Sequence, residues 1–476
     1  MAQRLLEAQR NRWTEADSFL GNLSQMWDPS SSPLLTIREW SKQYGKCYGM
    51  QEGVRNVLVV SDVDMLQELF VKKFENFHAR KLFPLAPNPD TDPNVHVFAA
   101  RGARWKRLRN LSNPSFSVNN LKKIMPTVQD SVDVMVDYME QHADTGKSFN
   151  IHLYYQELTL DVIARIAMGQ KGTRQFENEF FEDVKGNVSR KVLDTFSKFG
   201  IMKVPFWDLI HKVELAVKER KEARARGERE DVDEFGNERV DYIDLFLDAE
   251  TEVINEENEF ERAGGQKIEK KLTTEEIVAQ CVVFLLAGFD TTANSLAYAS
   301  FCLARSPEVQ RRLQAEIDEI CVDGEVTYEQ IQKLTFMDKV VKEALRLYPL
   351  AAVANSRICM KSTTLGDVHV EKGTYVMADV FSVHYDEQLW DRPEEFNPDR
   401  WDSEDKRHQL SWFPFGAVRE RFCVGMRLAY MEEKLALIKT LRRFNIVAAP
   451  DTEQKLELIG ASVVQPKAVT IRLEAR

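Results

Sequence analysis

Residues 412–427 read WFPFGAVRERFCVGMR, a loop with two glycines and three arginines that leads into an apolar helical pattern beginning at Leu428. Cys423 stands between Arg421 and Gly425. A thiolate is stabilised by nearby positive charge and by the backbone N–H groups at a helix N-terminus, and this segment can supply both. The pattern therefore indicates a metal-ligating thiolate, of the kind that binds haem iron and favours O–O cleavage. The alternative is a cysteine that packs as a small apolar side chain.

A second segment, residues 285–295, reads LLAGFDTTANS inside an apolar run that begins at Ile277. Thr273 and Glu276 form a capping-box pattern, which predicts that a long helix begins there. In the middle of this helix, Thr291 can donate a hydrogen bond to the carbonyl one turn earlier, and Gly288 weakens the helix and lets a flat cofactor approach. With Asp290 beside it, this turn can deliver protons. The alternative is a core helix that tolerates a glycine.

Two further segments combine a carboxylate with arginines. Glu343 and Arg346 are three residues apart and share a face of a predicted helix, and Arg400 follows in the stretch FNPDRW. A carboxylate bridged by two guanidinium groups would fix the later segment to the helix, since removing one partner leaves a buried charge unpaired. A solvated surface ion pair is the alternative for Glu343 and Arg346 alone.

Composition narrows the class of protein. The chain has 476 residues and a formal net charge of −11, and no stripe of basic and aromatic residues, so a nucleic-acid partner is not expected. Its six cysteines are scattered without CxxC spacing, which argues against a zinc site or a disulfide framework. No histidine of the eight stands in a ligand-like loop; His384 and His408 lie in segments typical of turns. We expect one large domain, mainly α with a small β region.

Taken in order, these segments resemble the cytochrome P450 superfamily of haem-thiolate monooxygenases over nearly the whole chain. Five segments resemble motifs of the family, and they occur in the same order along the chain. They are Trp105 with Arg109, residues 287–292, Glu343 with Arg346, Arg400 and the cysteine loop. Shorter stretches are similar to the microsomal class, in particular to its family-3 and nematode branch, and they are Tyr44-Gly45-Lys46, Asn113-Pro114-Ser115-Phe116 and His384-Tyr385-Asp386.

The resemblance implies the cytochrome P450 fold, with a long central helix over the haem, and haem b (iron protoporphyrin IX) as cofactor. It implies Cys423 as the iron ligand and Asp290 and Thr291 as the catalytic pair that steers protons, while Glu343, Arg346 and Arg400 are structural. The implied haem-binding residues are Arg80, Trp105, Arg109, Ala287, Gly288, Arg357, Phe415, Arg421 and Cys423.

For function, the resemblance implies insertion of one oxygen atom from O₂ into an apolar small-molecule substrate. Because the chain has no flavin or dinucleotide-binding module, electrons would come from a separate NADPH-dependent flavoprotein reductase. We expect a cationic docking face for this acidic partner, formed by Lys342, Arg421, Arg427 and Lys434. An alternative is a reductase-independent haem isomerase, against which Asp290 and Thr291 argue, because such an enzyme needs no proton delivery to O₂.

The cysteine loop differs from the family pattern in its length. In the family the loop phenylalanine precedes the cysteine by seven positions, whereas Phe415 precedes Cys423 by eight, and Glu420 places an acid near the ligand. Two explanations stay open: an error of the gene model at this point, or a genuine variant with weakened haem binding. The second leads to another alternative function, a haem-poor or inactive protein of the same fold.

The N-terminus lacks the apolar anchor of the microsomal class. Residues 1–32 are polar, and residues 33–476 are expected to form a single haem-binding monooxygenase domain. Family resemblance predicts the endoplasmic reticulum membrane, but the chain as written predicts a soluble protein. Residues 199–207, which read FGIMKVPFW, could still contact a bilayer interface, with ordinary loop packing as the alternative.

Overall fold

A computed structural model describes residues 14–15, 20–26, 28, 30–82, 86–177, 205–228, 236, 241–250, 271–322, 324–417 and 419–476. The chain forms two compact units, each assembled from three stretches of sequence. The first comprises residues 1–86, 342–423 and 457–467, and the second comprises residues 87–341, 424–456 and 468–476. The prediction that residues 33–476 form one domain stays a prediction.

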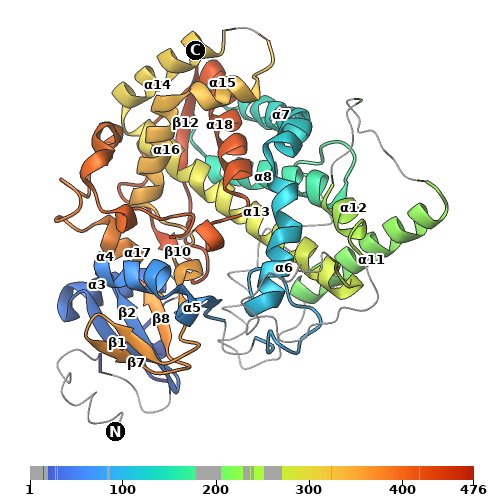
Figure 1. Cartoon of the computed structure of the whole chain (residues 1–476). Helices are drawn as coiled ribbons and strands as arrows, with labels where there is room; N and C mark the ends of the chain where they lie inside the picture. Colours follow the sequence, from blue (N-terminus) through green and yellow to red (C-terminus); the bar gives the residue numbers. More distant parts are fainter. Residues whose placement is uncertain are drawn as a thin grey trace. The chain divides into compact units, whose positions relative to one another are not determined.

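The first unit is organised around a five-stranded mixed sheet, with its strands drawn in blue and orange in Figure 1, in the order β1-β2-β8-β5-β3. The strands are β1 (Cys47–Glu52), β2 (Arg55–Val60), β3 (Ala79–Arg80), β5 (Arg357–Ile358) and β8 (Tyr375–Ala378). Only β2 and β8 pair in parallel; the other neighbours are antiparallel. Gly53 has a φ of +58°, which lets β1 turn back into β2.

Helices and short turns complete the first unit. They are α2 (Leu23–Met26), α3 (Pro33–Tyr44), α4 (Val63–Gln67), η2 (Glu68–Lys72), α5 (Phe74–Phe77), η5 (Ala352–Asn355), α17 (Val380–His384), η6 (Pro398–Lys406), η7 (Gln409–Ser411) and η8 (Arg419–Arg421). Two antiparallel hairpins belong to it as well, β6 (Thr363–Leu365) with β7 (Val368–Val370) and β10 (Leu458–Ile459) with β11 (Gln465–Pro466).

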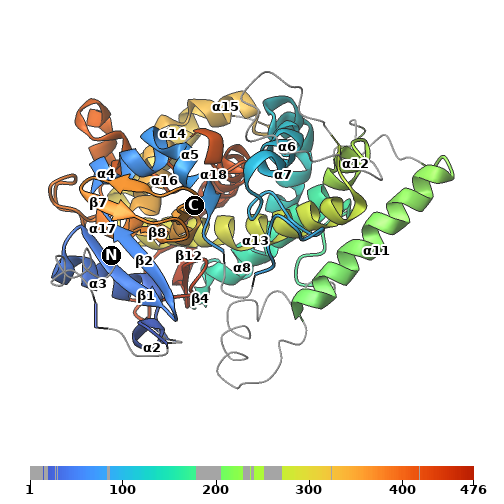
Figure 2. The ribbon, with the colours of Figure 1, turned by 60° about the horizontal axis from the view of Figure 1, so that its bottom comes forward.

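The second unit is built around α13 (Thr274–Ala304), with α8 (Ile151–Met168) along its side (Figure 2). The predicted capping box is confirmed: Thr273 accepts from the backbone N–H of Glu276, and the Glu276 carboxylate accepts from that of Thr273. Arg107 pairs with the same carboxylate at 2.7 Å. The start of the long helix is therefore fixed both by its cap and by a buried ion pair.

Other helices of the second unit are α6 (Gly102–Ser112), η3 (Asn113–Phe116), α7 (Val118–Glu140), α11 (Pro205–Ala225), α12 (Tyr242–Leu247), α14 (Pro307–Ile320), α15 (Tyr328–Lys333) and α18 (Met426–Arg443). A small sheet has the order β4-β12-β9, with β4 (Phe149–Asn150), β9 (Phe444–Val447) and β12 (Thr470–Ala475). The helix α16 (Thr335–Leu347) contributes residues to both units. The predicted fold class, mainly α with a small β region, is confirmed.

Among the residues described, α13 is the one helix long and apolar enough to cross a membrane. Of its most apolar window, 67% is buried inside the protein. A buried helix of this kind is typical of the core of a globular protein. The predicted bilayer contact at residues 199–207 lies largely outside the described residues, and so does most of the polar N-terminal segment.

Candidate active site

The predicted site residues are divided between the two units. Arg80, Phe415, Arg421, Cys423 and Arg357 belong to the first unit, together with Glu343, Arg346 and Arg400. The second unit contains Trp105, Arg109, Ala287, Gly288, Asp290 and Thr291.

The cysteine loop closes on itself within the first unit. The backbone N–H of Cys423 donates to the carbonyl of Phe415 at 2.8 Å. Gly416 has a φ of +107°, and a Cβ there would lie 3.2 Å from the carbonyl oxygen of Arg421, so the turn needs a glycine. The chain then passes through η8 and presents Cys423 as an exposed residue. The loop thus keeps a backbone hydrogen bond across its base, although Phe415 precedes Cys423 by eight positions.

Three arginines gather near this loop in the first unit. Arg80 and Arg357 are paired across β3 and β5, and Arg80 donates to the carbonyl of Arg421 at 3.3 Å. Arg421, which is 2% exposed, donates to the carbonyl of His78 at 2.6 Å. Arg357 donates to the carbonyls of its neighbours at positions 354 and 356. In each of these contacts the acceptor is a carbonyl oxygen, which carries no net charge.

Arg357 is the most deeply buried of these three arginines. It is 1% exposed, and burial together with the charge of Arg80 holds its pKa well below the usual range. No carboxylate in the described ranges forms an ion pair with Arg357. A buried guanidinium group of this kind is suited to an anionic partner, because a carboxylate can supply both a compensating charge and bidentate hydrogen bonds.

In the second unit, the predicted turn of α13 has the expected hydroxyl contact. The Thr291 hydroxyl donates to the carbonyl of Ala287 at 2.7 Å, which confirms the predicted bond to the preceding turn. Ala287 is exposed and Thr291 half-buried, although most of the helix around them is buried. Since the two residues are four apart, they share one face. This face is an open strip on a core helix.

Gly288 has a second reason to be glycine that the sequence could not show. A Cβ at this position would lie 2.8 Å from Cδ1 of Ile163 on α8. The glycine therefore allows α8 and α13 to approach closely. Its predicted contact with the cofactor stays a prediction.

Asp290 is the neighbour of Thr291 in the chain, and its side chain accepts a hydrogen bond from a residue of α8. The side-chain amide of Gln156 donates to its Oδ1 at 3.2 Å. Burial raises the pKa of Asp290, and the hydrogen bond from Gln156 opposes this increase. Sequence reasoning missed Gln156, because no spacing within α8 indicates which residue of α13 it faces.

On α6, Trp105 and Arg109 are one turn apart and share a face. Trp105 is buried and Arg109 half-buried. Arg107, on another face of α6, is occupied by its ion pair with Glu276. The two predicted residues are thus separated from the structural arginine of the same helix.

The predicted bridge around Glu343 is present in full in the first unit. Arg346 donates to both carboxylate oxygens at 2.9 and 3.0 Å, and Arg400 donates to one of them at 2.8 Å. The indole N–H of Trp401 and the backbone N–H of Asn397 add bonds of 3.1 Å each. The side chains of Glu343 and Arg346 are 0% exposed and that of Arg400 is 7% exposed. The surface alternative for this pair is therefore excluded.

Comparison with known proteins agrees with these features. The family model "Cytochrome P450" matches residues 15–472. The chain belongs to the cytochrome P450 family. It is 42% identical to the putative cytochrome P450 CYP13A3 of Caenorhabditis elegans, over 96% of this chain and 92% of that protein. It is 44% identical to the putative cytochrome P450 cyp-13B1 of the same organism, with the same coverage.

The cytochrome P450 family uses haem as its cofactor, and the residues of this chain fit it. An exposed thiol in a closed loop suits a metal ligand, because a thiolate needs access and neighbouring positive charge. Haem carries two propionate carboxylates, which are the anions that buried Arg357 and its neighbours Arg80 and Arg421 can bind. The exposed strip at Ala287 lets a flat group approach the backbone of α13.

The predicted cationic docking face is wrong in two of its four members. Arg421 is 2% exposed and Lys434 is 3% exposed. Lys434 donates to the carbonyl of Ile331 at 2.9 Å and pairs with Asp338 at 2.7 Å inside the second unit. Lys342 is half-buried with its ammonium group 5.4 Å from the centre of the Trp401 ring. Arg427 is exposed. The prediction used the charge of these residues alone, whereas Arg421 and Lys434 are buried and have internal partners.

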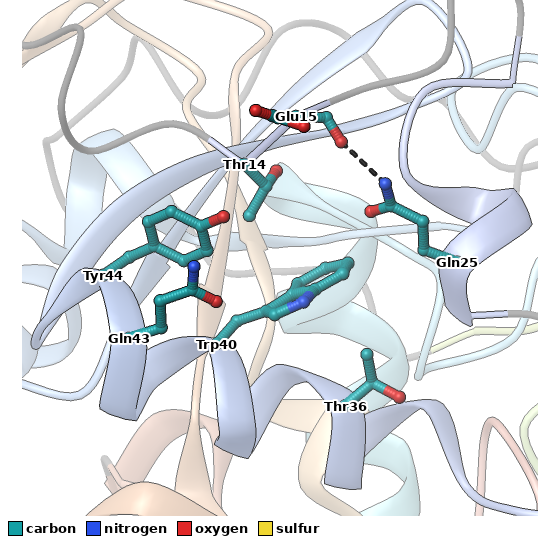
Figure 3. Close-up of a pocket in the computed structure, with 7 residues that line it drawn as sticks. All are labelled: Thr14, Glu15, Gln25, Thr36, Trp40, Gln43 and Tyr44. Carbon is teal, nitrogen blue, oxygen red and sulfur yellow. Dashed lines mark hydrogen bonds between the residues drawn. The ribbon is translucent and has the colours of Figure 1, made fainter.

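A separate hollow of about 370 Å³ lies in the N-terminal part of the first unit (Figure 3). It is lined by Thr14, Glu15, Gln25, Thr36, Trp40, Gln43 and Tyr44. Among the lining residues, the side-chain amide of Gln25 donates to the backbone carbonyl of Glu15 at 2.8 Å. The lining contains one carboxylate, no basic side chain and none of the predicted site residues, so it does not match the chemistry of a propionate site.

Proposed function

We propose that this chain is an active haem-thiolate monooxygenase, with Cys423 as the axial ligand and an apolar small molecule as substrate. The observation that carries the proposal is the closed cysteine loop. A backbone hydrogen bond of 2.8 Å from Cys423 to Phe415 closes the loop despite the additional residue, and Cys423 is an exposed residue. Haem, when bound, supplies the O₂ activation and oxygen insertion, and the protein supplies orientation and electrostatics.

The predicted residues of the two units would have the following roles. Arg80, Arg357 and Arg421 would bind the propionates by charge-assisted hydrogen bonds, with Trp105 and Arg109 as further propionate partners from α6. Ala287 and Gly288 would form the wall beside the cofactor. Thr291 would hold a water molecule with its hydroxyl, and Asp290 would take up and release the proton, because burial keeps its protonated form accessible.

We also propose that electrons come from a separate NADPH-dependent flavoprotein reductase and that the protein works at the endoplasmic reticulum membrane through peripheral contact. The reductase part is supported by membership of the cytochrome P450 family, which implies a redox partner in general. Vesicle flotation of the purified chain tests the membrane part: recovery with endoplasmic reticulum lipids supports it, and a chain that stays in the lipid-free fraction contradicts it.

The absorption spectrum of the reduced protein under carbon monoxide tests the central claim. We expect the strongly red-shifted Soret band of a thiolate-bound haem in the wild type. Cys423→Ser should lose this band, and Cys47→Ser, a control at a half-buried cysteine on β1, should keep it. A folded wild-type chain with an absent or histidine-like band would overturn the proposal and favour the haem-poor alternative.

A second assay separates the monooxygenase from the reductase-independent isomerase. With reductase, NADPH and O₂, a monooxygenase consumes NADPH in proportion to oxygenated product. Turnover of organic hydroperoxides without reductase, combined with no NADPH-dependent product, would favour the isomerase instead.

A further inference from the structure

The contact between Gln156 and Asp290 is a polar bond inside a largely apolar helix interface. The amide Nε2 lies 3.2 Å from Oδ1 of Asp290, the neighbour of Thr291. Within the described ranges, no Lys, Arg or His forms an ion pair with Asp290. A neutral amide is therefore the group that holds this carboxyl.

Other contacts join α8 to α13 on either side of the Gln156–Asp290 bond. His152 and Asn294 are joined at 2.7 Å, and Tyr155 and Ser300 are also joined at 2.7 Å. On the other side of the Gln156–Asp290 contact along the two helices, Gly288 lets Ile163 approach the backbone of α13. Because these contacts keep α8 and α13 together, the bond from Gln156 is not needed to hold the helices. Its effect falls on the carboxyl itself.

The charged and titratable surroundings of Asp290 are sparse. His152 on α8 is kept neutral by burial, which lowers its pKa to about 4, and Tyr298 on α13 is kept neutral because burial raises its pKa. Glu433 of α18 binds Ser295 instead. Among the described residues of α11 and α12, which also pack on α13, no charged group acts on Asp290. Gln156 is thus the main polar influence on Asp290.

We propose that Gln156 is a positioning residue for proton delivery: its amide orients the Asp290 carboxyl beside Thr291 and balances its protonated and ionised forms. This inference rests on the proposed function of Asp290. An amide N–H favours the ionised carboxylate, whereas burial favours the neutral acid. A group that passes protons needs both forms within reach at working pH. Without the amide, Asp290 would keep its proton too strongly.

The test is the infrared titration of the Asp290 carboxyl in the full-length ferric protein, with Asp290→Asn to assign the C=O band. Gln156→Leu should move the midpoint upward by about one to two pH units, as expected for loss of a hydrogen bond to a charged group. Gln156→Glu, which keeps the shape of the side chain, should also move it upward, because two adjacent carboxyls compete for ionisation. An unchanged midpoint in both variants would overturn the inference.

Gln170→Leu is the matched control, because Gln170, just after the C-terminal end of α8, donates to Asp161 of α8 with the same bond length of 3.2 Å. It should leave the Asp290 titration unchanged. In turnover, Gln156→Leu should lower the product formed per NADPH and move the pH optimum upward, and Gln170→Leu should do neither. Equal shifts in both variants would mean a general effect of helix packing and would contradict the specific role.

The measurements distinguish a wrong role for Asp290 from a wrong role for Gln156. If Asp290→Asn forms as much product per NADPH as the wild type, the proton role of Asp290 is wrong. If Asp290→Asn uncouples the reaction while Gln156→Leu changes neither titration nor coupling, the function of Asp290 stands and the role of Gln156 is wrong.

Discussion

Glu343 in the first unit and Asp290 in the second are both carboxylates inside the protein, but their partners differ completely. Glu343 accepts hydrogen bonds from two arginines, an indole and a backbone N–H. Asp290 accepts one bond from a neutral amide. A buried carboxylate bridged by two guanidinium groups ties segments of the chain together, whereas burial without a neighbouring cation raises the pKa of Asp290. The first arrangement suits structure and the second suits proton transfer.

The largest effect on stability is expected from removing the negative charge of Glu343. Glu343→Gln leaves Arg346 and Arg400 buried with reduced compensation, so we expect the free energy of unfolding to fall by about 3–5 kcal/mol. Chemical denaturation of the purified protein measures this. Glu394→Gln is the control, because the pair of Glu394 with Arg38 has a 73% exposed carboxylate and should contribute little. A similar loss in the two variants would contradict the structural role of Glu343.

A third carboxyl sharpens the comparison. Glu433 on α18 is buried, accepts from the Ser295 hydroxyl at 2.8 Å, and has its pKa raised by burial to about 8. Because the folded pKa lies above the unfolded value, this group stabilises the fold at low pH, and the contribution is lost as the pH rises towards about 8. The mechanism is the cost of ionising a buried carboxyl.

Glu433→Gln should therefore become more stable relative to the wild type as the pH rises from 5 to 8, by about 2 kcal/mol at the upper end once relaxation of the site is allowed for. Thermal unfolding measured across this pH range tests it. Parallel stability curves for the two proteins would show that Glu433 is already ionised in the folded state.

Sequence reasoning found the features whose geometry is local. Glu343 and Arg346 share a helix face at three-residue spacing, and Thr291 reaches the carbonyl of Ala287 within one turn, so both contacts could be predicted. Gln156 could not, because its partner depends on how α8 lies against α13. The burial of Lys434 was missed for a related reason: its partners Ile331 and Asp338 are distant in sequence, and a lysine on a helix otherwise indicates a solvated face.

The smallest expected change in free energy belongs to the open strip of α13, and it separates function from stability. Thr291→Ala removes the hydroxyl that bonds to the carbonyl of Ala287 at 2.7 Å, so we expect the product formed per NADPH to fall about tenfold, equivalent to about 1.4 kcal/mol. Stability should stay within about 0.5 kcal/mol, because alanine is a better helix former and compensates for lost packing.

Thr291→Ser is the matched control, since it keeps the hydroxyl and should retain most of the coupling. The measurement is oxygenated product against NADPH consumed, with the unfolding free energy determined on the same preparations. Equal coupling in Thr291→Ala and the wild type would show that the hydroxyl only completes the helix turn. A loss of both coupling and stability in the two variants would show that Thr291, like Glu343, is mainly structural. The distinction between the Glu343 site and the Asp290–Thr291 turn would then be wrong.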